Sequence, residues 1–489
     1  MSARTGAEFL EGLRRTNREI WVGNERVDDV TAHPQLAGGA AALAAVFDRQ
    51  HECATDCLMP DPETGEPINV SHMLPRSKDD LLRRHIGLAR VSETTAGLMG
   101  RTPDYMNVTF AGFAANPGLW QGSDGANGEG YDNLVRFQKR LAREDLSLTH
   151  TIVHPTNDRM NDSNFKQNRV PVRKVAETAE SIIVRGCRIL STLAPFADEL
   201  AIYPGVPLPG PGHEEFALSF AIPIDAPGLH FLCRDSVATP GADPFDRPLS
   251  TRFDEQDAFV IFDDVEVAKN RIFIDGNEGV YNTVMGSPMS PWWPNIMQQT
   301  TLRALTKLEF VYSLTTRMAE AVNDLTPHTL EALGELQSYV ECTRSALLLA
   351  EEHAHDYGDG FVFPDARPLH PMRSLLATWF PRAHEIMIQI GSHNLLAAPS
   401  RAMLDDATLR PLIDEFLHGA NGIDAERRAA LYRLAWDYVG SSLGARNDLY
   451  ERNYLASART NRTASHMRYA DRSHGDELVE RMLSSGDRR

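Results

Sequence analysis

Cysteine is scarce in this chain, with 5 among 489 residues, and the five are scattered except for Cys53 and Cys57. An odd number of dispersed cysteines disfavours a disulfide framework and favours a reducing compartment. No further cysteine or histidine stands at metal-ligand spacing beside Cys53 and Cys57, so both are interpreted as structural thiols. We therefore expect a cytoplasmic protein without a bound metal.

Long apolar runs and an excess of basic charge are also missing. No apolar stretch approaches the roughly 18 residues that a membrane-spanning helix needs, and the N-terminus has no apolar signal core. Asp and Glu outnumber Lys and Arg by 67 to 49, which gives a net charge of −18. This balance disfavours binding to nucleic acid and to an anionic membrane.

Two cofactor signatures are absent as well. No Gly-x-Gly-x-x-Gly follows a predicted strand, so the sequence does not indicate a Rossmann-type nicotinamide site. No His-Glu-x-x-His occurs either, and His353 and His355 are two residues apart, which points them to different faces of a helix. The chain therefore shows no sign of its own nicotinamide or metal centre.

The periodicity of apolar residues divides the chain into three parts. Residues 1–146 are predicted to be helical, with clear helices over 35–47, 79–91 and 129–143 and a Gly-rich loop over 121–130. Residues 147–276 are predicted to form an antiparallel β domain, a barrel or a sandwich, from short strands bounded by turns, and we take the β-barrel as the prediction. Residues 277–489 return to helical spacing and predict a four-helix bundle with a polar tail.

The individual predictions for the second and third parts are specific. In the β domain we expect a strand on each side of Gly186 and further strands over 215–223, 229–233 and 258–262, with an irregular Pro- and Gly-rich loop over 204–212. In the bundle we expect helices over 300–323, 329–355, 372–397 and 425–449, and a surface arm over 457–489.

Arg101, Tyr105 and His150 are the residues that best suit chemistry on a phenol. Arg is effectively always charged, and beside a phenolic oxygen it favours the phenolate, whose ortho carbon is the more nucleophilic. Tyr105 can donate a second hydrogen bond, and His150 can do the same or remove the proton. Spacing alone also allows a structural interpretation, in which Arg101 pairs with Asp104 and the other two lie in the core.

The segment Gly100-Arg101-Thr102-Pro103-Asp104-Tyr105 resembles the GR(S/T)PDY motif of the 4-hydroxyphenylacetate 3-hydroxylase family, and Leu148-Thr149-His150 resembles its LTH motif. These are the large oxygenase components of two-component, flavin-dependent phenol monooxygenases. The resemblance implies that Arg101, Tyr105 and His150 contact the substrate hydroxyl. It also implies an acyl-CoA dehydrogenase-like α+β fold, with the flavin between the β domain and the bundle.

Five further segments resemble the family, at 184–195, 248–265, 301–310, 389–392 and 434–454. The match around 184–195 implies that Thr192 contacts the flavin, and the helix around 301–310 offers Arg303 and Lys307, four residues apart, to the cofactor phosphates. The segment 389–392, with Gln389, Gly391 and Ser392, resembles one that approaches FAD from a neighbouring subunit. The carboxylates at 254, 255 and 257 are interpreted as structural, and 434–454 is the longest single match.

The resemblance implies that reduced FAD, delivered by a separate NAD(P)H:flavin reductase, reacts with dioxygen and hydroxylates a phenol ortho to its hydroxyl to give a catechol. It also implies a homotetramer.

One alternative is a halophenol monooxygenase of the same family. A second is an iron–sulfur acyl-CoA dehydratase of the same superfamily, which is disfavoured because no cysteine occurs between Cys57 and Cys187. The identity of the phenol stays open between 4-hydroxyphenylacetate, coumarate, tyrosine and biosynthetic intermediates, and the loops 206–215 and 121–130 are expected to contact its distal group.

Overall fold

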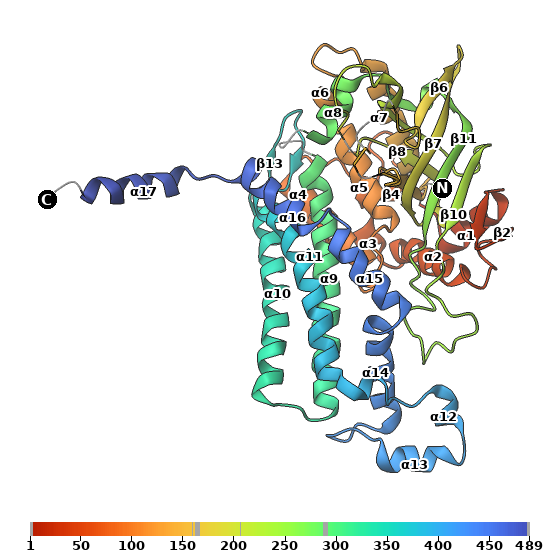
Figure 1. Cartoon of the computed structure of the whole chain (residues 1–489), viewed down its shortest axis with the longest axis vertical. Coiled ribbons are helices and arrows are strands. Elements are labelled where there is room, and N and C mark those ends of the chain that lie inside the picture. The colour runs from red at the N-terminus through yellow and green to blue at the C-terminus, as the bar shows by residue number, and fades with distance from the viewer. Residues whose placement is uncertain (1–2, 159, 162–166, 206, 287–291, 487–489) are drawn as a thin grey trace.

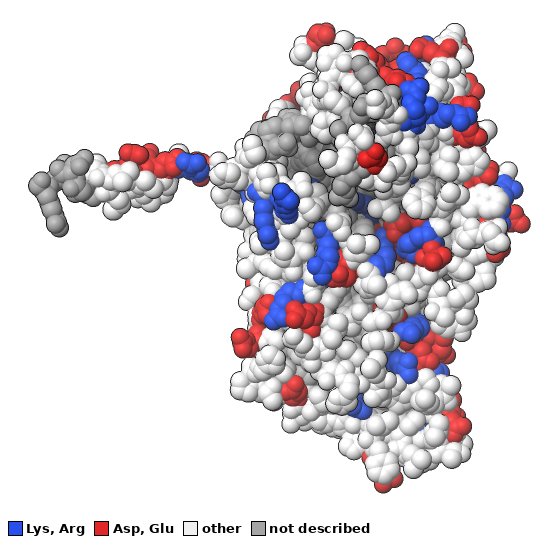
Figure 2. Space-filling model, in the orientation of Figure 1, with Lys and Arg blue, Asp and Glu red and all other residues white. Residues whose placement is uncertain are grey.

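A computed structural model describes residues 3–158, 160–161, 167–205, 207–286 and 292–486 of the chain. Figure 1 shows short helices and sheets in the upper part of the view and long, roughly parallel helices below them, with the last helix projecting from the body. Figure 2 shows acidic and basic side chains interspersed on the visible face. Within the described ranges, no helix is both long enough and apolar enough to cross a membrane.

The N-terminal part is mainly helical because its segments begin with residues that satisfy the free N–H groups of a helix. Thr5 and Glu8 form a reciprocal capping box, Ser77 caps the helix predicted over 79–91, and Pro103 occupies the first turn after Arg101. The helices are α1 (Gly6–Arg15), α2 (Ala37–Glu52), α3 (Ala54–Cys57), α4 (Lys78–Thr94), α5 (Pro103–Ala114), α6 (Pro117–Trp120) and α7 (Gly128–Arg143).

Two sheets form the β part. The larger has the strand order β2-β1-β10-β11-β7-β6 and the smaller β12-β9-β8-β5, and neighbours are antiparallel except for β1 with β10 and β5 with β8. Two short hairpins lie elsewhere. The strands are β1 (Ile20–Val22), β2 (Glu25–Val27), β3 (Leu58–Pro60), β4 (Pro67–Asn69), β5 (Leu148–Thr151), β6 (Arg173–Glu177), β7 (Ser181–Thr192), β8 (Glu199–Ile202), β9 (Leu218–Pro223), β10 (Leu229–Cys233), β11 (Asp257–Ala268), β12 (Ile272–Asp275), β13 (His355–Asp356) and β14 (Val362–Phe363).

Three predictions for the sheets are wrong in detail. β1 and β2 come from the segment predicted to be helical, since strands of three residues are too short to show a period. The break at Gly186 does not occur, because β7 is continuous. Glycine is needed there for two reasons: its φ is 145°, and a Cβ would lie 2.6 Å from the Pro171 carbonyl oxygen. Residues 214–216 form a 3-10 turn, so β9 begins only at Leu218.

The C-terminal part is a bundle around one long central helix. The helix α9 packs against α10, α11 and α14, and Figure 1 shows α9, α10 and α11 side by side. The helices are α8 (Glu278–Gly286), α9 (Trp292–Ala321), α10 (Pro327–Glu352), α11 (Ala366–Gly391), α12 (Arg401–Asp405), α13 (Leu409–Phe416), α14 (Ala425–Val439), α15 (Ser442–Asn453), α16 (Ala458–Ala464) and α17 (Ser473–Gly486).

The prediction of one helix over 425–449 is wrong, because α14 ends at Gly440 and Ser441 caps a new helix, α15. A Cβ at Gly440 would collide with the ring of Trp436, so the chain needs glycine at this turn. The predicted surface arm is correct only for α17. The preceding helix α16 packs against α11 and buries Asn461.

The interior contains two main clusters of buried apolar side chains. One fills the space between the sheets, α2 and the lower half of the bundle. The other joins α5, α9 and the smaller sheet, and includes Tyr105, Phe113, Tyr203 and Trp292. Each aromatic side chain of this kind stabilises the fold by about 2 kcal/mol when fully buried. The second cluster contains Tyr105, against whose ring Arg101 and His150, the other two residues predicted to contact a phenol, are packed.

Candidate active site

Arg101 lies immediately before α5, with its backbone fixed from both sides. Gly100 passes so close to Tyr450 that a Cβ would collide with the phenolic hydroxyl, so only glycine fits there. The N–H of Arg101 donates a hydrogen bond to Glu255 Oε1 at 2.6 Å. The spacing of the motif therefore has a local cause: Gly100 allows the approach, and Pro103 starts the helix.

The guanidinium of Arg101 is enclosed by tyrosine rings. Its central carbon lies 3.9 Å from the ring centroid of Tyr105 and 4.4 Å from that of Tyr454. Within the described residues, no carboxylate forms an ion pair with this side chain, and Nη1 is buried without a hydrogen-bond partner. Burial opposes the charge, and the faces of the Tyr105 and Tyr454 rings offset part of that cost. A buried cation without an anion is suited to bind an oxyanion.

His150, in β5, lies on the other side of Tyr105. The two rings are stacked with centroids 5.5 Å apart and an interplanar angle of 23°, and His150 stacks equally closely on Tyr203. Burial, and then the charge of Arg101, lower the pKa of His150 well below its usual value. The imidazole is therefore neutral at pH 7, the form that accepts a proton. The structure thus brings together the three residues predicted from the motifs.

Three tyrosines of this cluster were not predicted. Tyr203 follows β8, whereas Tyr450 and Tyr454 lie at the end of α15 with ring centroids 4.6 Å apart. Burial raises the pKa of Tyr203 and of Tyr450 well above the usual value, so both phenols stay protonated. A signal for two of them was present in the sequence, because Arg446, Tyr450 and Tyr454 are spaced by four residues on one helix face.

Thr192, the predicted flavin contact, lies at the end of β7 and is buried. Its hydroxyl donates a hydrogen bond to Asp257 Oδ1 at 2.8 Å, and Asp257 also forms ion pairs with Arg446 and Arg234. Arg446 simultaneously binds Glu255 at 2.7 Å. The carboxylates at 255 and 257 therefore connect Thr192 to the backbone of Arg101. Asp254 binds Arg234 in the same network.

Arg303 and Lys307 lie on one face of α9, but both side chains form ion pairs with Glu451. Arg303 Nη1 and Lys307 Nζ contact Glu451 Oε1 at 2.8 and 3.0 Å, and all three side chains are almost completely buried. Burial opposes ionisation of Glu451, yet the two cations lower its pKa to about 2. The expected contact with cofactor phosphates therefore finds no support in the contacts of this chain.

The segment predicted to approach FAD from a neighbouring subunit ends α11. Gln389 and Ser392 are exposed, whereas Gly391 is buried against Leu395. The contacts within the chain do not connect these residues to Arg101, and the exposed side chains are accessible to a second copy. Their role stays a prediction.

The loop 207–213 is anchored beside the aromatic cluster. Leu208 is buried in that cluster, and its N–H donates to Asn282 Oδ1 in α8 at 2.8 Å. Residue 206 of the predicted specificity loop lies outside the described residues.

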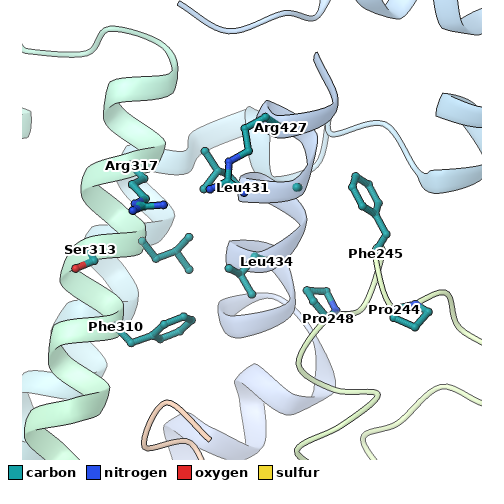
Figure 3. A pocket seen from close by; sticks show the side chains of 11 residues that line it. Pro244, Phe245, Pro248, Phe310, Ser313, Arg317, Arg427, Leu431 and Leu434 are labelled. Carbon is teal, nitrogen blue, oxygen red and sulfur yellow. The ribbon is translucent and has the colours of Figure 1, made fainter. Parts of the chain in front are cut away.

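A separate groove of about 470 Å³ opens between the segment 244–248 and the helices α9 and α14 (Figure 3). Its walls are mainly apolar, with Phe310 and Leu434 facing Pro248 across it and with Arg317 and Arg427 at one end. It lies between the β part and the bundle, where we expected the flavin, but Arg101, Thr192 and the other predicted site residues do not line it.

Residues 5–274 match the N-terminal part, and residues 292–484 the C-terminal part, of the protein family described as 4-hydroxyphenylacetate 3-hydroxylase. The chain belongs to this family. One relative is the 4-hydroxyphenylacetate 3-monooxygenase oxygenase component of Thermus thermophilus. It is 35% identical to this chain, over 93% of this chain and 92% of the relative.

Two solved structures place the fold. A crystal structure of the oxygenase component HpaB, complexed with FAD and 4-hydroxyphenylacetate, is 33% identical and superposes with a TM-score of 0.92 over 99% of both chains. An archaeal 4-hydroxybutyryl-CoA dehydratase superposes with a TM-score of 0.86 at 16% identity, which shows a shared fold alone. The predicted family and the acyl-CoA dehydrogenase-like fold class are confirmed.

Proposed function

We propose that this protein is the oxygenase component of a two-component phenol monooxygenase, which uses reduced FAD and dioxygen to hydroxylate a phenol ortho to its hydroxyl. One observation carries the proposal: the buried Arg101 guanidinium, with a free Nη1, lies between Tyr105 and Tyr454 and next to the neutral His150. A phenol hydroxyl suits this position because the cation stabilises its phenolate and the imidazole accepts its proton.

The residues around Arg101 fit a bound flavin. Tyr450 Oη and Tyr454 Oη are buried without hydrogen-bond partners in the described chain, and Thr192 lies on the same carboxylate–arginine network. We infer that Thr192 contacts the flavin, and that Gln389, Gly391 and Ser392 of a neighbouring copy complete the cofactor site in a homotetramer. When bound, reduced FAD supplies the two electrons that activate dioxygen.

The chain itself contributes binding, orientation and proton transfer. Arg101 holds the phenolic oxygen, Tyr105 donates a hydrogen bond to it, and His150 takes its proton. The buried aromatic cluster excludes water, which protects the activated oxygen from wasteful release as hydrogen peroxide. In the net reaction one atom of dioxygen is inserted into the ortho C–H bond to give a catechol, the other leaves as water, and reduced FAD is oxidised to FAD.

The substrate is a phenol of the 4-hydroxyphenylacetate type. Because the sequence has no nicotinamide motif, we infer that a separate NAD(P)H:flavin reductase supplies the reduced FAD. A cytoplasmic location stays a prediction.

The test is product analysis with purified protein, reduced FAD from any flavin reductase, and 4-hydroxyphenylacetate. The wild type should form the catechol, and Arg101→Met should lose at least about 100-fold in kcat/KM, the cost of removing a charged hydrogen bond in a dry site. Arg185→Gln, which changes an exposed arginine paired with Asp264, serves as the control. Full coupled hydroxylation by Arg101→Met would contradict the assigned role, and halide release from a chlorophenol would favour the halophenol reaction instead.

A further inference from the structure

A second arginine near the aromatic cluster has no anionic partner. Arg373, in α11, donates a hydrogen bond from Nη2 to the Leu455 carbonyl at 2.8 Å, and its central carbon lies 4.6 Å from the ring centroid of Trp293. Its Nε is buried without a hydrogen-bond partner, and among the described residues no carboxylate lies within ion-pair distance of it. Burial lowers the pKa of Arg373, but guanidinium groups remain protonated in proteins.

An unpaired guanidinium with a buried nitrogen is costly, so its presence calls for an explanation. Arg84 also has unpaired nitrogens, but its Nε donates to Gln298 at 2.9 Å in a region where Glu351 lies close. Arg373 contacts a carbonyl and an aromatic face, and the phenol of Tyr469 also lies near its charge. It is therefore the better candidate for an arginine that awaits an anionic ligand.

Arg373 is connected to the phenol-binding residues by a closed series of aromatic contacts. Each neighbouring pair in the series has ring centroids between 4.2 and 6.4 Å apart, and the last member precedes Leu455, to which Arg373 is hydrogen-bonded. Starting from the ring that Arg373 covers, the series runs Trp293, Trp292, Phe113, Tyr203, His150, Tyr105 and Tyr454.

The two arginines join this series at different places. Arg101 contacts Tyr105 and Tyr454, whereas Arg373 contacts Trp293 and the residue after Tyr454. Arg101 covers the ring of Tyr454, and Arg373 is hydrogen-bonded to the carbonyl of the next residue, Leu455, so both guanidinium groups lie near the same short segment. A flat aromatic molecule with an oxygen at each end suits a site with aromatic walls and a cation at two points.

The charges next to the Arg101 backbone also favour binding of an anion at Arg373. Glu255 and Asp257, both paired with Arg446, lie next to the Arg101 backbone on the Thr192 side. These carboxylates disfavour a second anion there, whereas the surroundings of Arg373 contain an uncompensated cation. The anionic end of a phenolic acid is therefore stabilised at Arg373 and not near Glu255.

We propose that Arg373 binds the carboxylate of a phenolic acid whose hydroxyl lies at Arg101, and so selects acidic phenols. This rests on the proposed function. The nearest competing ligand is a phosphate of the flavin nucleotide, which offers similar oxygen atoms to a guanidinium.

The experiment compares 4-hydroxyphenylacetate with its neutral amide, 4-hydroxyphenylacetamide. Equilibrium dissociation constants for both are measured anaerobically on the full-length protein with reduced FAD, together with kcat/KM for catechol formation. In the wild type the acid should bind more tightly than the amide. Arg373→Gln should raise the dissociation constant of the acid by about 10- to 100-fold and that of the amide by less than about threefold, because only the acid loses a charged hydrogen bond. Arg373→Lys should retain part of the preference.

The control is Arg367→Gln, an exposed arginine on the same helix that pairs with Asp365. If Arg373→Gln weakens the binding of the acid and of the amide equally, the proposal is overturned. It is also overturned if the dissociation constant for reduced FAD rises while the preference for the acid is unchanged, because that result assigns Arg373 to a flavin phosphate. Absence of catechol from the wild type would contradict the proposed function instead, and the ratio of the two binding constants would still report on Arg373. Arg373→Lys provides the same comparison if Arg373→Gln does not fold.

Discussion

Glu255 accepts a hydrogen bond from the backbone N–H of Arg101 at 2.6 Å, although 154 residues separate the two in the sequence. The other carboxylate oxygen of Glu255 binds Arg446, which also binds Asp257 and through it the hydroxyl of Thr192. A single network thus sets the position of the proposed phenol-binding arginine relative to the proposed flavin contact. Such relative positions decide whether oxygen reaches the ring or is lost.

Replacing Glu255 should therefore uncouple oxygen activation from hydroxylation. Glu255→Gln keeps an acceptor for the Arg101 N–H but removes the charge that Arg446 pairs with, and Glu255→Ala removes both. We expect catechol yield per reduced FAD consumed to fall modestly in the first variant and about tenfold in the second, with hydrogen peroxide making up the difference. Glu309→Gln, at an exposed position, is the control. Unchanged yield in Glu255→Ala would contradict this link.

A methyl group at Gly100 should displace Arg101. Gly100→Ala places a Cβ against the Tyr450 hydroxyl, and overpacking of this kind costs about 1–3 kcal/mol. We expect a fall of at least about tenfold in kcat/KM and a lower Tm. Gly118→Ala meets no atom within 4 Å and should leave both unchanged. Equal behaviour of the two variants would show that the Tyr450 contact does not constrain the loop.

Asp104 gives a prediction on stability and pH. Burial raises the pKa of this carboxyl to about 6 from 3.8, so the folded state binds its proton more tightly than the unfolded state does. The stability that this proton provides is complete below about pH 4 and is lost as the pH rises through about 6. Asp104→Asn cannot ionise and keeps an oxygen for the amide of Gln299, which donates to Asp104 at 2.9 Å. Thermal unfolding should show the variant more stable than the wild type at pH 8, with the difference shrinking between pH 6 and 4.

Glu451 should behave in the opposite way. The adjacent Arg303 and Lys307 lower its pKa to about 2 from 4.5, so its ionised form stabilises the fold above about pH 4.5 and this contribution is lost as the pH falls toward 2. Glu451→Gln leaves two buried cations without an anion, and we expect a loss of about 3–5 kcal/mol at pH 7. The difference in Tm from the wild type should narrow below pH 4.5. A variant as stable as the wild type at pH 7 would indicate that a cofactor phosphate or another anion takes over the pairing.

Part of the fold followed from periodicity alone. The helices over 79–91 and 129–143 and the strand over 229–233 were predicted correctly because each shows its buried face at a regular spacing. The helix break was missed although Gly440 and the capping Ser441 are a local signal for it, and the short strands were missed because β1 depends on pairing with the distant β10 and β2 on pairing with β1. The local periodicity of apolar residues shows which face of a helix or strand is buried, but it does not show which other segment covers that face.

The sequence by itself determined the family and the trio of Arg101, Tyr105 and His150, because these residues lie within short motifs of defined spacing. Only the tertiary structure decided that Glu255 holds the Arg101 backbone, that Glu451 takes the charges of Arg303 and Lys307, and that Tyr454 covers the Arg101 guanidinium. The physical reason is distance along the chain. Partners brought together from the segments before α5 and β11, and from α9 and α15, share no local periodicity. The energy of pairing a buried charge depends on which partner the packed core brings within reach.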